Sequence, residues 1–158
     1  MQKERILIVE DDADVLTLLK EMISYLGYET DVAIDGEIAI KKLKMGNLSV
    51  VITDINLPKI DGLQVPKHIK EEYQQIEVIV ITGYAKKHSF TDVINAGATD
   101  FLVKPFSQDE LTAKLGRIVR EHTLLVKLKN EINERRQAEE SLRESEATLE
   151  SILMTAPI

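Results

Sequence analysis

Five short apolar segments alternate with amphipathic stretches along residues 5–104, and this alternation limits the possible folds more than any other feature of the chain. The apolar segments are rich in β-branched residues and span residues 5–10, 29–34, 50–53, 77–82 and 100–104. Each is apolar on both faces or nearly so, which is typical of strands that helices cover on both sides. The stretches between them have helical spacing and span residues 13–26, 36–45, 62–73 and 86–96. The alternation predicts an α/β domain with a parallel sheet and right-handed crossovers.

The number of strands indicates a topology. Five strands fit a flavodoxin-like, doubly wound sheet with strand order 2-1-3-4-5, whose functional site lies at the carboxyl ends of the strands. In the first predicted helix, apolar residues recur at helical spacing at Val15, Leu18, Leu19, Met22 and Leu26. Pro66 falls inside the third predicted helix, and we expect it in the first turn, where proline is tolerated.

Polar side chains follow the predicted strands at the point where each strand ends. These residues are Glu10, Asp11 and Asp12 after the first strand, Asp54 on the third, Thr82 on the fourth and Lys104 on the fifth. Because the carboxyl ends of parallel strands meet at one edge of the sheet, we expect these side chains to share a crevice. Taken alone, Asp54 could cap a turn, Asp12 could cap a helix, Thr82 could simply end a strand and Lys104 could be solvated.

The expected crevice concentrates negative charge. Two carboxylates about 5 Å apart repel by roughly 3 kcal/mol at an effective dielectric constant of 20. Lys104 or a divalent cation could offset this repulsion, and an all-oxygen site suits Mg²⁺. Such a site would bring a phosphoryl group to Asp54, which could attack it to form an aspartyl phosphate. The cation and Lys104 would neutralise the phosphoryl oxygens, and Thr82 could donate a hydrogen bond to one of them.

Taken together, four segments resemble a response-regulator receiver domain, the phospho-accepting part of a two-component system. They read "ILIVEDDADVL", "VVITDINLPKIDGL", "VIVITGYA" and "AGATDFLVKPFSQDEL", and the resemblance runs from residue 4 to about residue 121. It implies that Asp54 is phosphorylated by a sensor histidine kinase or a phosphotransfer protein. It further implies that Asp11 binds Mg²⁺ (or Mn²⁺) directly, that Glu10 binds it through water, and that Asn56 offers its backbone carbonyl.

The same resemblance implies a conformational switch. Thr82 would be the switch hydroxyl and Lys104 the amine that faces the phosphoryl group. Lys104–Pro105 would be a cis peptide bond, which is affordable before proline. Phe101 occupies the position of the aromatic switch, where many members have tyrosine. Because Phe101 has no hydroxyl, ring burial alone would signal the state of the domain.

From residue 107 the sequence predicts one long helix. Ser107 is the expected N-cap, with Glu110 as its capping-box partner. No glycine or proline interrupts residues 123–155, and at about 1.5 Å per residue the segment would extend roughly 50 Å. A heptad repeat places Leu125, Leu128, Ile132, Arg135, Glu139, Leu142, Glu146, Leu149 and Leu153 at core positions. This pattern favours a coiled-coil homodimer, although a solvated single helix is the alternative.

The end of the chain has a resemblance of its own. "RRQAEESLRESEATLESILMTAPI" is similar to the helix that leads into a PAS domain. This implies a receiver domain over residues 1–121, and a coiled-coil linker over residues 122–158 that ends where a PAS domain begins. We therefore expect a fragment of a longer protein, whose output domain could be a histidine kinase or a cyclic-dinucleotide enzyme. The fragment itself would not be an enzyme beyond accepting and slowly losing its own phosphoryl group.

Composition excludes several other classes of function. The formal net charge of −7 gives no electrostatic help to nucleic-acid binding, and the absence of cysteine excludes disulfides and thiol chemistry. No signal peptide or membrane span is expected, which favours a cytoplasmic protein. Two alternatives stay open, namely a dimerising module with an inactive receiver and a phosphatase of the haloacid-dehalogenase type. The phosphatase signature needs a second aspartate two residues after the first, where this chain has Asn56.

Overall fold

The structure is a computed structural model that describes residues 3–83 and 88–155. The chain divides into two units, Met1–His122 and Thr123–Ile158, and each is described by itself. Parts of three sequence predictions lie outside the described residues. These are the last two residues of the receiver-like segment "VIVITGYA", the start of the helix expected over residues 86–96, and the last three residues of the PAS-like segment.

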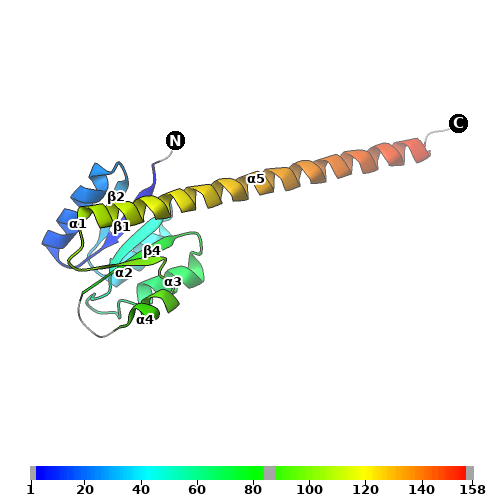
Figure 1. Cartoon of the computed structure of the whole chain (residues 1–158). Coiled ribbons are helices and arrows are strands. Elements are labelled where there is room, and N and C mark those ends of the chain that lie inside the picture. The colour runs from blue at the N-terminus through cyan, green and yellow to red at the C-terminus, as the bar shows by residue number, and fades with distance from the viewer. Residues whose placement is uncertain (1–2, 84–87, 156–158) are drawn as a thin grey trace. The chain divides into compact units, whose positions relative to one another are not determined.

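A parallel sheet of five strands forms the centre of the first unit (Figure 1). The strands are β1 (Arg5–Val9), β2 (Glu29–Ala33), β3 (Val50–Asp54), β4 (Glu77–Thr82) and β5 (Asp100–Val103). They lie in the order β2-β1-β3-β4-β5 with every neighbouring pair parallel, so the predicted flavodoxin-like topology is confirmed. All five residues of β3 are buried, as expected for the central strand of a sheet covered on both faces.

The helices begin and end close to the predicted limits. They are α1 (Ala13–Tyr25), α2 (Gly36–Lys44), α3 (Gln64–Glu72), α4 (Phe90–Asn95) and α5 (Gln108–Thr155). Asp12 caps α1 by accepting hydrogen bonds from the backbone amides of Asp14 and Val15. Pro66 is the third residue of α3 and lies in its first turn, as predicted. The helix α4 is shorter than predicted because the Ser89–Asp92 capping box fixes its start at Phe90.

Two hydrophobic clusters lie on opposite faces of the sheet. One cluster joins the sheet to α1 and the first turns of α5 through Leu19, Ile23, Leu111, Leu115 and Ile118. The other joins the sheet to α2, α3 and α4 through Ala39, Leu43, Val65, Ile69 and Val93. Leu18, which has helical spacing with the buried residues of α1, is nevertheless 50% exposed. Helices on both faces leave the carboxyl ends of the strands as the open edge where polar side chains can gather.

The loop after β3 closes tightly on itself at Gly62. A Cβ atom at this position would lie 1.6 Å from the backbone carbonyl oxygen of Ile55, which is closer than any real contact. We therefore expect Gly62→Ala to lower the free energy of unfolding by about 3 kcal/mol, because the backbone must move to accept the methyl group. Urea denaturation measures this difference.

Gly116→Ala is the matched control for this substitution. The added methyl group would meet only the Arg120 side chain at 3.5 Å, in the interior of α5. We expect Gly116→Ala to stabilise the protein by about 0.5–1 kcal/mol, since alanine favours the helix over glycine. Equal effects of the two substitutions would contradict the importance of the close approach at Gly62.

The long helix α5 continues without interruption from the first unit into the second. Ser107 accepts a hydrogen bond from the Glu110 amide at 3.1 Å, which confirms the predicted N-cap. In the second unit every described residue is exposed, and this includes the six apolar residues of the heptad, Leu125, Leu128, Ile132, Leu142, Leu149 and Leu153. Among the helices of the described residues, none is long and apolar enough to span a membrane.

Candidate phosphoryl-acceptor site

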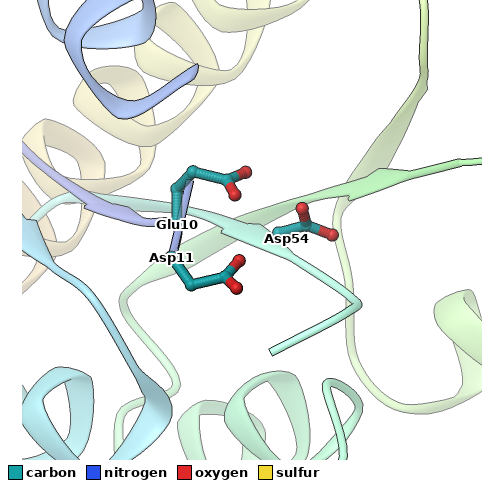
Figure 2. A group of neighbouring side chains, drawn as sticks. All are labelled: Glu10, Asp11 and Asp54. Carbon is teal, nitrogen blue, oxygen red and sulfur yellow. The ribbon is translucent and has the colours of Figure 1, made fainter. Parts of the chain in front are cut away.

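Three carboxylates gather at the carboxyl edge of the sheet (Figure 2). Glu10 and Asp11 directly follow β1, and Asp54 is the last residue of β3. The two strands are parallel neighbours, and their register pairs Val9 with Thr53, so the residues that follow end at the same edge. Each carboxylate offers an oxygen within 4.8 Å of an oxygen of the other two. This spacing would let one small cation contact all three side chains.

Lys104 places a positive charge on this cluster. Its ammonium group donates a hydrogen bond to Oδ2 of Asp54 at 2.7 Å and lies 3.6 Å from Oε2 of Glu10. The backbone amide of Lys104 donates to the carbonyl oxygen of Thr82 at 2.7 Å, which fixes the end of β5 against the end of β4. Lys104–Pro105 is a cis peptide bond, as predicted. The sheet therefore brings Lys104 to Asp54 although fifty positions separate them in the sequence.

The buried surroundings of this cluster shift the pKa values of Glu10 and Lys104. The Glu10 side chain is 1% exposed. Burial raises its pKa to about 7, and the neighbouring negative charge of Asp54 adds to this effect. The hydrogen bond from the Asp12 amide at 3.1 Å and the charge of Lys104 act in the opposite direction. For Lys104, burial alone would lower the pKa, but the hydrogen bond to Asp54 and the charges of Asp54 and Glu10 outweigh it and raise the pKa.

The raised pKa of Glu10 predicts a pH dependence of stability in the absence of divalent cations. Because the folded state holds the proton more tightly than the unfolded state, Glu10 stabilises the fold below pH 4.5, and this contribution is lost as the pH rises to about 7. In EDTA, the wild type should lose on the order of 2–3 kcal/mol relative to Glu10→Gln between these pH values. Urea denaturation of both proteins across this range measures the difference, and parallel curves would contradict the assignment.

Thr82 and Asn56 border the cluster in different ways. Thr82 is buried at the end of β4, one residue after Ile81, which pairs with Asp54 in the sheet. Asn56 donates its backbone amide to Oδ1 of Asp54 at 2.9 Å. Next to the cluster lies a cavity of about 290 Å³, and its lining includes Asp11, Asn56 and His88. Asp54 is thus held by one hydrogen bond on each oxygen. Asp11 is the member of the acidic cluster that lines the neighbouring cavity.

Phe101 is held between two side chains from different helices. Its ring stacks on Phe90 of α4 with a centroid distance of 4.4 Å and an interplanar angle of 10°. The Lys114 ammonium group of α5 lies 5.1 Å from the ring centroid and donates to the Phe101 carbonyl oxygen at 2.6 Å. Phe101 itself is only partly buried. The roles of Phe90 and Lys114 were not predicted from the sequence, because neither residue belongs to a motif and their contact with Phe101 arises only in the folded chain.

A scan against protein families gives one match, the response regulator receiver domain, over residues 6–116. This match covers more than half of the 158 residues. The chain belongs to the response regulator receiver family. The resemblance inferred from the four sequence segments is therefore confirmed.

Curated relatives of this receiver are transcriptional regulators. They include the probable transcriptional regulator ycf27 of Porphyridium aerugineum, which is 33% identical over 76% of this chain and 50% of its own length. The alkaline phosphatase synthesis regulatory protein PhoP of Bacillus subtilis is 34% identical over 74% of this chain and 49% of its own length. The chain spans about half the length of the curated relatives it matches.

Solved structures of receivers have the same fold. A CheY-like receiver domain protein from Methanospirillum hungatei matches with a TM-score of 0.73 and 27% identity over 77% of this chain and 98% of that chain. The response regulator TrrA from Thermotoga maritima matches with a TM-score of 0.66 and 38% identity over 73% of this chain and 98% of that chain. TrrA was crystallised in complex with Mg²⁺ and BeF.

The acidic cluster of this receiver is suited to a hard divalent cation. Its donors are carboxylate oxygens, which Mg²⁺ and Mn²⁺ prefer. Oε2 of Glu10 is buried and accepts no hydrogen bond from any described residue, since the Lys104 ammonium group at 3.6 Å is too distant for one. A buried oxygen without a partner costs free energy, and a cation or its bound water would remove that cost. The residues present therefore fit the cation that the family implies.

Proposed function

We propose that this protein is a phosphorylation-controlled signalling switch that accepts a phosphoryl group on Asp54. The observation that carries the proposal is the position of Asp54, with the Lys104 ammonium group at 2.7 Å and the carboxylates of Glu10 and Asp11 gathered beside it. A lone aspartate that capped a turn would need neither neighbour. The donor would be a phosphohistidine on a sensor histidine kinase or a phosphotransfer protein.

The side chains of the site suggest how Asp54 reacts. The Asn56 amide holds Oδ1 and the Lys104 ammonium group holds Oδ2, so the carboxylate is oriented before a donor arrives. An oxygen of Asp54 attacks the phosphorus, and the bond from phosphorus to the donor breaks. Lys104 and the Thr82 hydroxyl would then stabilise the negative charge on the phosphoryl oxygens. Mg²⁺ or Mn²⁺, held by Glu10, Asp11, Asp54 and the carbonyl of Asn56, would supply further neutralisation of this charge.

The same site could control the packing of the last strand and helix. Phosphorylation would favour one of two arrangements of Thr82, Phe101 and the turn at Pro105. The Lys104 amide links β5 to Thr82, and Lys114 links Phe101 to α5. These two contacts, joined by the backbone of β5, support a route from the phosphoryl site to the helix that would carry the signal.

In the longer protein that we propose, α5 connects the receiver domain (residues 1–121) to its output. Residues 122–158 would form a coiled-coil linker between two copies of the chain and would lead into a PAS domain and a further output domain. The apolar heptad residues support this homodimer, because all six are exposed in the single chain. The phosphoryl donors of such a pathway are made from ATP, so the protein would act in the cytoplasm, without a nucleic-acid or membrane partner. The fragment would catalyse only its own phosphorylation and slow dephosphorylation.

Intact-mass spectrometry after incubation with acetyl phosphate tests the phosphoryl-acceptor function. We expect a single phosphoryl adduct in the presence of Mg²⁺ and almost none after chelation with EDTA. Adding Mg²⁺ back should restore the adduct. The absence of an adduct with Mg²⁺ present, in protein that is folded by circular dichroism, would instead support a dimerising module with an inactive receiver.

A further inference from the structure

A shallow hollow lies on one side of α5 in the second unit. The residues that line it are Leu128, Glu131, Ile132, Glu134, Arg135 and Ala138. In a pair of parallel helices, a core side chain of one helix fits into a hole formed by four residues of the partner helix. Relative to the number of the core residue, these four lie at positions −4, −1, 0 and +3. For Ile132 these four residues are Leu128, Glu131, Ile132 and Arg135, all of which line the hollow. The hollow therefore has the composition of a hole for Ile132 of a second copy.

The apolar residues around the hollow need a partner. Leu128 is 53% exposed and Ile132 is 46% exposed in the single chain. A second copy of the chain carries the same apolar residues at these positions. Its α5 helix could therefore cover Leu128 and Ile132 with apolar side chains. This inference rests on the homodimer proposed above, and it adds the orientation and the register of the two helices.

The charges beside the hollow distinguish the two orientations. In a parallel pair, Glu131 lies opposite Arg136 of the second copy, which gives two attractive pairs per dimer. In the antiparallel pairing that sets Ile132 opposite Leu149, Arg136 instead approaches Arg143 of the other chain. Neither Glu131 nor Arg136 forms an ion pair within its own chain in the part that the structure describes. Both are therefore available to a partner helix.

We propose that two copies of this chain pair through α5 in parallel and in register, with Ile132 of each copy in the hollow of the other. The charged core residues Arg135 and Glu139 occupy successive layers directly after Ile132. In a parallel, in-register pair each of these side chains faces its own copy, and the Arg135 side chain of one helix can reach Glu139 of the other in the neighbouring layer. Charged core residues lower the stability of a coiled coil, but they disfavour registers that leave them unpaired.

Disulfide trapping tests the orientation, since the natural chain has no cysteine. We expect Ile132→Cys and Leu128→Cys in the full chain to form disulfide-linked dimers at least ten times faster than Asn130→Cys under mild oxidation. Asn130 is the matched control because it faces away from the seam. In the antiparallel pairing two copies of residue 132 would lie about 25 Å apart along the helix axis. A mixture of Ile132→Cys and Leu149→Cys that preferentially formed the mixed disulfide would overturn the proposal.

Sedimentation equilibrium provides a second, independent measurement. Glu131→Arg should raise the Kd of the dimer by roughly fivefold or more, because it replaces two attractive pairs by two repulsive ones. Adding Arg136→Glu to this variant should restore the Kd, whereas an unrestored Kd would contradict the parallel pairing. A wild-type chain that stayed monomeric at high micromolar concentration would also overturn the proposal. That result would leave phosphorylation of Asp54 intact, so the two proposals can fail separately.

Discussion

Asp54→Asn is expected to abolish phosphoryl incorporation while leaving the protein folded. The amide nitrogen and oxygen of asparagine cannot replace the carboxylate as the nucleophile, so no adduct should form even with excess acetyl phosphate and Mg²⁺. The fold should persist because asparagine has nearly the same shape, and its oxygen can still accept hydrogen bonds from Asn56 and Lys104. Intact-mass spectrometry measures the adduct, and urea denaturation measures the free energy of unfolding.

Asp35→Asn is the matched control for this experiment. Asp35 is also a buried aspartate that follows a strand of the same sheet, but it caps α2 and pairs with Lys59. Asparagine caps a helix about as well as aspartate, so Asp35→Asn should keep both the fold and the phosphoryl adduct. An adduct on Asp54→Asn would place the acceptor elsewhere and would overturn the assignment of the site.

Lys104→Met should lower the rate of phosphorylation by acetyl phosphate on the order of 100-fold. The substitution removes a charge that lies 2.7 Å from the acceptor, and the loss of one preorganised donor at a reacting oxygen typically has this effect. In EDTA it should also lower the free energy of unfolding by about 1–3 kcal/mol. Asp54 would then be a buried carboxylate without its cation, although the partial exposure of Lys104 reduces the cost.

The response to Mg²⁺ separates an electrostatic role of Lys104 from a packing role. The Lys104 ammonium group neutralises the same carboxylates that a bound cation would neutralise. Mg²⁺ should therefore stabilise Lys104→Met more than it stabilises the wild type. Lys59→Met is the control, since it removes an ion pair with a buried aspartate outside the site. It should leave the rate of phosphorylation unchanged. Equal stabilisation of Lys104→Met and the wild type by Mg²⁺ would show that Lys104 does not offset the charge of the cluster.

The strand order and the meeting of Glu10, Asp11, Asp54 and Lys104 could be predicted from the sequence. Each of these residues follows or ends an apolar segment, and a parallel sheet sends all such ends to one edge. The sequence could not predict how the Lys104 ammonium group divides its contacts between the carboxylates of Asp54 and Glu10. The ammonium group of Lys104 lies closer to Asp54 than to Glu10, and this leaves an oxygen of Glu10 without a hydrogen bond. That outcome depends on side-chain reach and burial rather than on spacing.

Two further differences between prediction and structure have physical causes. Leu18 shares helical spacing with the core of α1, but the buried side of the helix is centred on Leu19 and Ile23, and Leu18 points about 100° away from Leu19. The stacking of Phe90 on Phe101 joins residues from two elements. A single sequence contains no signal for such a contact, because the residues are related only through the packing of α4 against the end of β5.

The unsatisfied oxygen of Glu10 has a consequence for attempts to evolve or engineer this protein. The ion-free fold is locally frustrated at that position, since the surrounding structure favours a neutral side chain there. A selection for thermostability alone would therefore enrich uncharged residues at position 10 and gradually remove the acid that would help to hold the cation at the proposed phosphoryl-acceptor site. A chain that retains the acid at position 10 is less stable without a cation but keeps a residue that the proposed function needs. This is the usual trade-off between stability and activity.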